Sequence, residues 1–335
     1  MRMVIRFIIL ILMTVGLFLL NLFTGSVDIP AGEVTDILLH GDTEGGPAAF
    51  IVLGSRVPQA VTALLAGASL TTAGLLLQTA FRNPLAGPSI LGITSGAGLG
   101  VALVMLLLGG TVSFAGFTAG GYVAVLIGAL AGSLAVMGLL LLFSVWLKSD
   151  LMLLIAGIMT GYLTSSVVTL LNYLSSAEGI QSFTMWGMGS FGSVSRDQLP
   201  VFSMATGIGL LLAVVLMKPL NLILLGENYA RNLGVNMQRV RNLLLIATGV
   251  LTSVVTAFCG PIGFIGLAVP HIARMIFRTS DHRVIIPGCI LTGGVTGLLC
   301  NLLCLLPSDI MLPLNAVTPL IGVPVILWVI FKRRG

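Results

Sequence analysis

The sequence predicts an all-α membrane protein that forms a single transmembrane domain over residues 1–335. Of its 335 residues, 57% are hydrophobic and only 8% are charged, whereas soluble domains carry about 25% charged residues. The mean hydropathy is +1.11, and the polar residues could not cover that much apolar surface in a soluble fold. These numbers exclude a soluble, disordered or disulfide-rich secreted protein.

Ten apolar segments are long enough to form transmembrane helices, which need roughly 20 residues each. The segments are residues 5–23, 57–80, 89–108, 119–144, 151–172, 199–217, 241–258, 261–278, 284–305 and 315–331. The first follows Arg2 and Arg6, as in a secretory signal, but no Ala-x-Ala cleavage site comes after it. An uncleaved helix is therefore the better interpretation.

Glycines recur at four-residue spacing within or beside these segments. They are Gly92, Gly96, Gly100, Gly116, Gly120, Gly128, Gly132, Gly157, Gly161, Gly293 and Gly297. Small residues at this spacing let helix backbones approach closely in a bilayer. The spacing therefore predicts a tightly packed bundle.

The basic residues orient the chain, because cytoplasmic loops of membrane proteins carry most of the Lys and Arg. With the N-terminus inside and ten spans, Arg56 and Arg196 are the only basic residues that fall outside. This asymmetry predicts that both termini are cytoplasmic. It also accounts for the net charge of +5, so no nucleic-acid partner is expected.

The titratable residues argue against ion coupling through membrane-embedded carboxylates and against nucleotide- or metal-binding motifs. Every carboxylate falls at a span end or in a loop, whereas ion-coupled carriers place such groups inside the membrane. The sequence contains no GxxxxGK[ST] motif for a nucleotide and no HExxH motif for a metal. We interpret the four cysteines as buried apolar residues, although Cys300 and Cys304, one helical turn apart, leave a metal or redox pair open.

A transport protein that takes its energy from a partner fits these exclusions, and we expect no enzymatic activity, bound metal or bound cofactor in this chain. A stand-alone channel or an ion-coupled secondary transporter, with sodium held by backbone carbonyls, is the alternative. A membrane enzyme is the third class that the sequence leaves open.

The candidate contact with the energy-supplying partner is the longest inner loop, residues 218–240. Within it, a Glu and an Arg four residues apart favour a short helix, and a glycine suits its C-terminal cap. An ordinary interfacial helix is the alternative. The candidate coupling residues are Gly226, Glu227, Tyr229, Arg231, Leu233 and Gly234.

Several motifs, taken together, resemble the permease subunits of bacterial ATP-binding-cassette (ABC) importers for iron–siderophore, haem and cobalamin chelates. The likeness covers nearly the whole chain. Its motifs are Arg56-Val57-Pro58, residues 82–97, Leu225-Gly226-Glu227, Leu233-Gly234-Val235, residues 260–267, residues 270–274 and Asp281-His282-Arg283. Residues 186–192 and 281–289 are most similar to the cobalamin members.

The resemblance implies a type II ABC importer permease with ten helices, located as a multi-pass protein in the bacterial inner membrane. It implies a second copy of this chain, two cytoplasmic ATP-binding subunits that carry ATP and Mg, and an extracytoplasmic substrate-binding protein. Residues 226–235 would then belong to the coupling helices that contact the ATP-binding subunits. The sequence does not specify which chelate is carried.

Two interrupted segments are expected near the translocation path or the inner gate. Proline and glycine break the helix in each, and such backbone is tolerated at membrane depth only where protein or a water-filled path covers it. Kinks that serve packing alone are the alternative. The candidate residues are Asn83, Pro84, Leu85, Gly260, Pro261 and Gly263.

The two outer arginines are the candidates for docking the binding protein, because Arg forms bidentate hydrogen bonds with carboxylates. Arg56 is expected to contribute more than Arg196, since Pro58 stiffens its junction with the helix and the motif matches the family. Local pairing of Arg196 with Asp197 or Glu178 is the alternative.

The chain departs from the family pattern at four positions, and these departures put the docking geometry in doubt. Gln59 stands where a second arginine often follows the Arg-x-Pro motif, and Asn301 and Leu305 stand where an Asp and an Arg are common. Asn315 ends a segment that is often Glu-Leu-Pro-x-Gly. The loop at residues 148–151 also lacks the pair of small hydroxyl residues expected at an inner gate.

Overall fold

The computed structural model of the protein describes residues 2–41, 46–109, 111–114, 117–147, 149–306 and 311–332. Helices account for most of these residues, as predicted. The elements are α1 (Arg2–Phe23), α2 (Ala31–His40), α3 (Pro47–Ile51), η1 (Val52–Arg56), α4 (Val57–Ala80), α5 (Ile93–Ala102), η2 (Leu103–Leu107), β1 (Thr111–Phe114), β2 (Phe117–Gly120), α6 (Gly121–Trp146), α7 (Asp150–Leu174), α8 (Ala177–Gly187), η3 (Phe191–Ser193), α9 (Leu199–Val215), α10 (Met217–Leu224), α11 (Glu227–Asn232), α12 (Met237–Cys259), α13 (Ile265–Phe277), α14 (His282–Leu305) and α15 (Leu314–Lys332).

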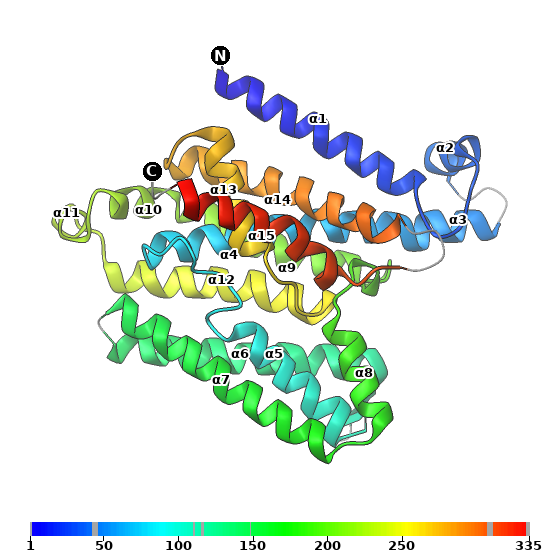
Figure 1. Cartoon of the computed structure of the whole chain (residues 1–335), viewed down its shortest axis with the longest axis horizontal. Coiled ribbons are helices and arrows are strands. Elements are labelled where there is room, and N and C mark those ends of the chain that lie inside the picture. The colour runs from blue at the N-terminus through cyan, green and yellow to red at the C-terminus, as the bar shows by residue number, and fades with distance from the viewer. Residues whose placement is uncertain are drawn as a thin grey trace.

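The helices form one bundle in which α4 is central and α1 is peripheral (Figure 1). Helix α4 contacts α9, α12, α13 and α14, and the apolar part of the segment Pro47–Ala80, which ends with α4, is 83% buried, against 6% for α1. Helix α12 lies between α4 and the group formed by α5, α6 and α7 (Figure 1). The bundle therefore has two groups of helices, one around α4 and α14 and one around α5–α7, with α12 in contact with both.

The ten predicted segments are all helical, but they differ in length. In the described part of the chain, six helical segments are long and apolar enough to cross a membrane, and α9 with α10, bent by 44°, makes a seventh if the two form one span. The segments Ile93–Leu107, Ile265–Phe277 and Leu314–Val329 are shorter apolar helices. Ten complete membrane crossings therefore remain a prediction.

A small antiparallel sheet between η2 and α6 is an exception to the all-α prediction. Strands β1 and β2 pair with Thr111 opposite Gly120 and Phe114 opposite Phe117. Strand β1 lies between the predicted segments 89–108 and 119–144, whereas β2 overlaps the first two residues of the second segment.

Glycines occupy the closest helix crossings, as their spacing predicts. A Cβ atom at Gly100 would overlap the carbonyl oxygen of Gly128 on α6, and one at Gly67 on α4 would overlap that of Gly293 on α14. Gly92 lies against Gly157 and Gly161 on α7 in the same way. Larger side chains at these positions would separate the helices. Gly116 lies outside the described residues.

The two ends of the bundle carry different elements (Figure 1). Helices α2, α3 and α8 lie at one end, which we call the outer end. Helices α10 and α11 lie at the opposite, inner end, and the start of α1 and the end of α15 lie toward it. Both termini are thus on the side of α11, in agreement with the predicted topology, although the orientation relative to the membrane stays a prediction.

Candidate functional site

The predicted inner loop folds into α10, α11 and the first turns of α12. Helix α11 ends in a Schellman motif: the amide of Val235 donates to the carbonyl of Ala230 (3.0 Å), and that of Gly234 donates to Arg231 (2.9 Å). Gly234 has φ = 83°, the left-handed conformation predicted for this cap and one that favours glycine. Gly226 precedes the helix with φ = 114°.

Helix α11 presents an apolar surface at the inner end. Ala230 is fully buried, whereas Tyr229 and Leu233 are each 54% exposed, and Leu224 and Leu225 beside them are also exposed. We call Leu224, Leu225, Tyr229 and Leu233 the coupling patch. Exposed apolar side chains grouped in this way mark a surface that a partner can cover.

The charged pair predicted on α11 is only partly described. Arg231 is exposed, but the side chain of Glu227 lies outside the described part of the structure. The predicted pairing between the two therefore stays a prediction.

A first polar anchor ties α10 to α14. The amide of Asn221 donates to Asp281 Oδ1 (2.6 Å), while its Oδ1 accepts from the backbone amide of His282 (2.7 Å) and contacts His282 Nδ1 (2.8 Å). His282 Nε2 in turn contacts Thr79 Oγ1 on α4 (3.0 Å). The backbone amide of Arg283 and the amide of Asn221 stabilise the Asp281 carboxylate, which lowers its pKa.

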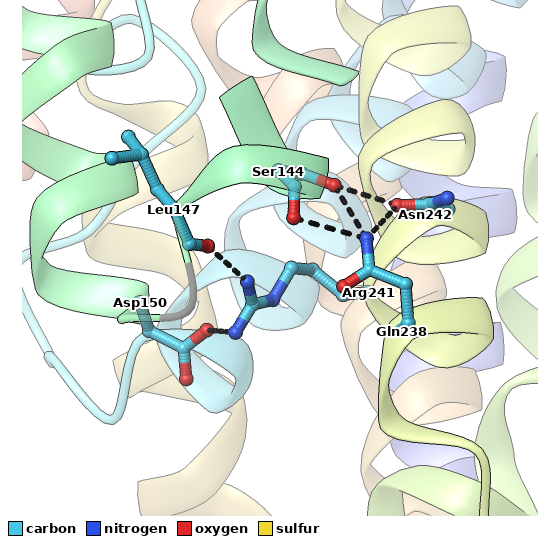
Figure 2. Close-up of polar contacts among 6 residues, drawn as sticks. All are labelled: Ser144, Leu147, Asp150, Gln238, Arg241 and Asn242. Carbon is cyan, nitrogen blue, oxygen red and sulfur yellow. Dashed lines mark hydrogen bonds and ion pairs between the residues drawn. The ribbon is translucent and has the colours of Figure 1, made fainter. Parts of the chain in front are cut away.

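A second polar anchor ties α12 to the end of α6 (Figure 2). Ser144 donates to Asn242 Oδ1 (2.7 Å), and the Gln238 amide donates to the carbonyl of Ser144 and to Asn242 Oδ1 (both 3.0 Å). These three side chains form a neutral cluster between the two helices.

Arg241 extends this second anchor to α7 (Figure 2). Its Nη1 donates to the Leu147 carbonyl at 2.9 Å, and its Nη2 lies 2.7 Å from Asp150 Oδ1. Sequence reasoning missed this pair, because Arg241 and Leu147 are 94 residues apart and no local spacing links them. The only sequence signal is the position of Asp150 at a helix N-terminus, where a negative charge is favoured.

The predicted gate residues Asn83, Pro84 and Leu85 lie in the connection after α4. Asn83 Oδ1 accepts from the backbone amide of Leu85 (2.9 Å), so Asn83 caps the turn as its type predicts. His271 Nε2 on α13 contacts the carbonyl of Pro84 (2.8 Å). This connection is therefore attached to α13 at the inner end.

The predicted path residues Gly260, Pro261 and Gly263 form the non-helical connection from α12 to α13. Asn315 on α15 hydrogen-bonds with the backbone of this connection: its Oδ1 accepts from the Gly263 amide (3.1 Å), and its Nδ2 donates to the carbonyl of Pro261 (2.7 Å). The same Nδ2 also donates to the carbonyl of Gly187 at the end of α8 (2.9 Å). Asn315, one of the departures from the family pattern, thus replaces hydrogen bonds that a helix would have made.

The two interrupted segments meet only in part. Residues 87–90 of the first and residues 262–264, 266 and 267 of the second line a common cavity of about 140 Å³. Asn83, Pro84 and Leu85 do not line it, and neither do Gly260 and Pro261. Of the six predicted residues, Gly263 alone lines this cavity, so the structure brings together the ends of the two segments more than the residues singled out in them.

The two predicted docking arginines lie in different environments. Arg56 is only 5% exposed, and its guanidinium donates to the carbonyls of Leu22 (2.9 Å), Phe23 (3.2 Å) and Val27 at the end of α1. Arg196 is exposed between η3 and α9. Docking stays a prediction for both residues, and exposure favours Arg196, the reverse of the expected ranking.

Two further departures from the family pattern contact each other. The Gln59 amide donates to Asn301 Oδ1 (2.9 Å), and the Asn301 amide donates to Asn21 Oδ1 (2.7 Å), all three being buried. A neutral amide chain thus stands where the family often has an arginine and an aspartate. Leu305, the remaining departure, is half-buried in the last turn of α14.

The described residues contain no group of three or more His, Cys, Asp or Glu side chains that could hold a metal ion. Cys300 and Cys304 are buried as free thiols, in agreement with their interpretation as apolar residues.

Comparison with known proteins identifies the family. The profile of the FecCD transport family matches residues 10–332. The vitamin B12 import system permease protein BtuC of Salmonella paratyphi A is 36% identical over 319 residues, covering 95% of this chain and 94% of BtuC, and BtuC of Salmonella typhi is equally similar.

A solved structure agrees with these sequence relatives. It is described as an inward-facing conformation of an ABC transporter assigned to the metal-chelate type, and it superposes with a TM-score of 0.83 at 30% identity, covering 98% of this chain and 99% of that chain. The resemblance found in the motifs is thereby confirmed. This chain belongs to the FecCD transport family.

Proposed function

We propose that this chain is the permease subunit of an ATP-driven importer that moves a bulky metal chelate across the bacterial inner membrane. Two copies of the chain would assemble with two cytoplasmic ATP-binding subunits and an extracytoplasmic binding protein. ATP and Mg would be bound by the ATP-binding subunits, and this chain would carry no enzymatic activity.

The coupling patch on α10 and α11 is the observation that carries the proposal. It combines exposed Tyr229 and Leu233 with a rigid cap at Gly234, at the inner end of the bundle. The two polar anchors connect the helices on either side of α11, which are α10 and α12, to α14 and to α6–α7, so a force applied to α11 would reach both groups of helices. The relatives named for vitamin B12 import favour a corrinoid substrate over an iron–siderophore complex or haem.

Reconstituted uptake tests the proposal. The chain is placed in proteoliposomes with the ATP-binding subunits and binding protein of the same organism, and radiolabelled cyanocobalamin, haem and a ferric hydroxamate are each offered. We expect ATP-dependent uptake of one of them, cyanocobalamin first, and none when the P-loop lysine of the ATP-binding subunit is replaced. Uptake without that subunit would instead identify a channel or a secondary transporter.

Gly234→Val tests the coupling role of α11. A β-branched residue in the left-handed conformation costs about 1–2 kcal/mol, so the cap and the coupling patch should shift and uptake should fall. Gly207→Val is the matched control, because Gly207 is exposed on α9 and has no atom within 4 Å of an added Cβ. Equal uptake by both variants would remove α11 from the coupling role.

Docking of the binding protein is tested by charge reversal at Arg196. Because this arginine is exposed, Arg196→Glu should weaken association and reduce its dependence on salt, since surface charge pairs are screened. Asp197→Asn, at the neighbouring exposed position, is the control. Salt-independent binding that Arg196→Glu leaves unchanged would contradict electrostatic docking at this position.

A further inference from the structure

We propose that the Arg241–Asp150 ion pair transmits movement of the inner loop at residues 218–240, which we call the coupling loop, to α6 and α7. Arg241 and Asp150 are then positioning residues for ATP-coupled import. This inference rests on the proposed function, which it extends by identifying the contact between the coupling loop and one group of helices.

Arg241 is connected to the coupling patch by a short stretch of hydrogen-bonded backbone. The Schellman motif fixes the chain at Gly234 and Val235, and Asn236 then caps α12 by accepting a hydrogen bond from the Arg239 amide (3.0 Å). No flexible linker separates α11 from α12. A displacement of α11 should therefore displace Arg241, which lies in the second turn of α12.

On the other side, Arg241 bridges two helices at once. The Leu147 carbonyl ends α6, and Asp150 begins α7, so one guanidinium contacts both sides of their connection (Figure 2). The helix ends also favour both charges: the Arg241 cation lies at the C-terminus of α6 and the Asp150 anion at the N-terminus of α7. The pair is thus placed where movement of α12 would shift α6 and α7 together.

The neighbouring side chains strengthen this connection. Gln238 lies one turn before Arg241 on α12 and Asn242 directly follows Arg241, and both hydrogen-bond with Ser144 on α6. In contrast, α10 is tied to α14 and α4 through Asn221 and His282. The coupling loop therefore has separate attachments to the two groups of helices, and Arg241 provides the ionic one.

Helix α11 itself also approaches this pair. A cavity of about 30 Å³ is lined by Asp150, Arg241 and Arg231, together with apolar residues. Asp150 thus lies beside arginines from both α11 and α12. Glycine crossings pack α5 tightly against α6 and α7, so a shift at Asp150 should move these three helices as a unit.

The test measures how many ATP molecules are hydrolysed per substrate imported, in the reconstituted importer with the labelled chelate that supports wild-type uptake. Asp150→Asn and Arg241→Gln are compared singly and combined. We expect each to raise this ratio about two- to fivefold, the factor that corresponds to a partly exposed ion pair. The ratio for the double variant should be no higher than for either single variant, because each substitution removes the same contact.

The control is Arg283→Gln, an exposed arginine at the same end of the bundle, which should leave the ratio unchanged. Co-purification of the ATP-binding subunits shows that each variant assembles. If removing a charge prevents assembly, Asp150→Glu keeps the charge and should give an intermediate ratio.

Hydrogen exchange supplies a readout independent of uptake. Binding of a non-hydrolysable ATP analogue should change protection at residues 229–235 and at 147–152 together in the wild type, and only at 229–235 in Asp150→Asn. Additive effects of the two substitutions, or an unchanged ratio with normal uptake, would overturn the inference. Absence of ATP-dependent uptake in the wild type would instead overturn the proposed function.

Discussion

Arg56 at the outer end and Arg241 at the inner end bind their surroundings in different ways. Arg56 is buried and donates only to backbone carbonyls, those of Leu22, Phe23 and Val27. Arg241 is half-buried and contacts one carbonyl and one carboxylate, both at the α6–α7 connection. Arg56 thus completes the end of a helix, whereas Arg241 joins separate helices.

A contrast in burial separates the other polar residues at the two ends. At the outer end, Asn315 also saturates backbone groups, and Gln59 and Asn301 form a buried amide pair. At the inner end, Asn221 contacts Asp281 at the start of α14, and Gln238 and Asn242 contact Ser144 on α6, in exposed or partly buried positions. Buried unsatisfied groups are costly, while exposed pairs exchange with water at little cost. The outer end should therefore be rigid and the inner end adjustable.

The largest expected effect is at the buried amide pair. Asn301→Asp introduces a charge beside neutral Gln59 and should lower the free energy of unfolding by about 3–5 kcal/mol, as for an uncompensated buried charge. Adding Gln59→Arg, the residue common in the family, should recover most of the loss. Thermal unfolding in detergent measures both variants. Equal melting temperatures for the single and double variants would contradict the buried pairing.

Arg56 should be nearly as sensitive. Arg56→Leu leaves the carbonyls at the end of α1 without their donor and should cost about 3 kcal/mol, since each buried unsatisfied group costs about 1–3 kcal/mol. Arg56→Lys keeps the charge but has fewer hydrogen-bond donors, so its stability should lie between that of the wild type and that of Arg56→Leu. Unfolding is followed by the same thermal assay. A change of a few tenths of a kcal/mol shifts the melting temperature by about 1 °C. If Arg56→Leu melted within that range of the wild type, Arg56 would not be structural.

Asn315 is expected to have a smaller effect, because its hydrogen bonds are only partly buried. Asn315→Leu should destabilise the protein by about 1–3 kcal/mol. Asn315→Asp keeps the acceptor for Gly263 but cannot donate to Pro261 or Gly187, so it should be destabilising as well. If Asn315→Asp were as stable as the wild type, the two donated hydrogen bonds would contribute nothing.

At the inner end, Asp150→Asn should change stability by less than about 1 kcal/mol, as expected for a partly exposed ion pair. The same substitution is expected to alter the ratio of ATP hydrolysed to substrate imported. This combination, a small change in melting temperature and a clear change in coupling, distinguishes the inner end from the outer end. A loss as large as that of Arg56→Leu would remove the distinction.

The smallest effect concerns pH. The amide of Arg283 and the side chain of Asn221 hold the pKa of Asp281 below its usual value, so the native state favours the ionised form. Its stabilising contribution is present above the unfolded pKa of about 3.9 and is lost as pH falls through the lower native pKa. Asp281→Asn, which can still cap α14, should weaken the fall in melting temperature over this acidic range. An identical pH profile would exclude this contribution.

Much of the fold could be predicted because it depends on local properties. Apolar length placed helices in all ten segments, and glycine spacing predicted close helix packing, which the structure shows where α5 crosses α6 and where α4 crosses α14. Gly234 was predicted as a helix cap from its neighbours alone, and it has φ = 83°. These features follow from the length and periodicity of short stretches, which the sequence states directly.

The site residues were harder to predict because their partners are distant in the chain. Gln59 and Asn301 are 242 residues apart, and Arg241 is 94 residues from Leu147. No local spacing links such residues. The position of Arg56 after an outer loop predicts an exposed residue. It is buried instead, because the end of α1 packs against its guanidinium.

The sequence by itself determined that the chain is a helical membrane protein, where its long apolar helices lie, and that residues 218–240 contain a short helix capped by Gly234. Only the tertiary structure decided which polar side chains close the outer end and which join the coupling loop to α6–α7. The physical reason is that apolar burial and helix capping act within a few residues. Hydrogen bonds and ion pairs between helices depend instead on how the whole bundle packs.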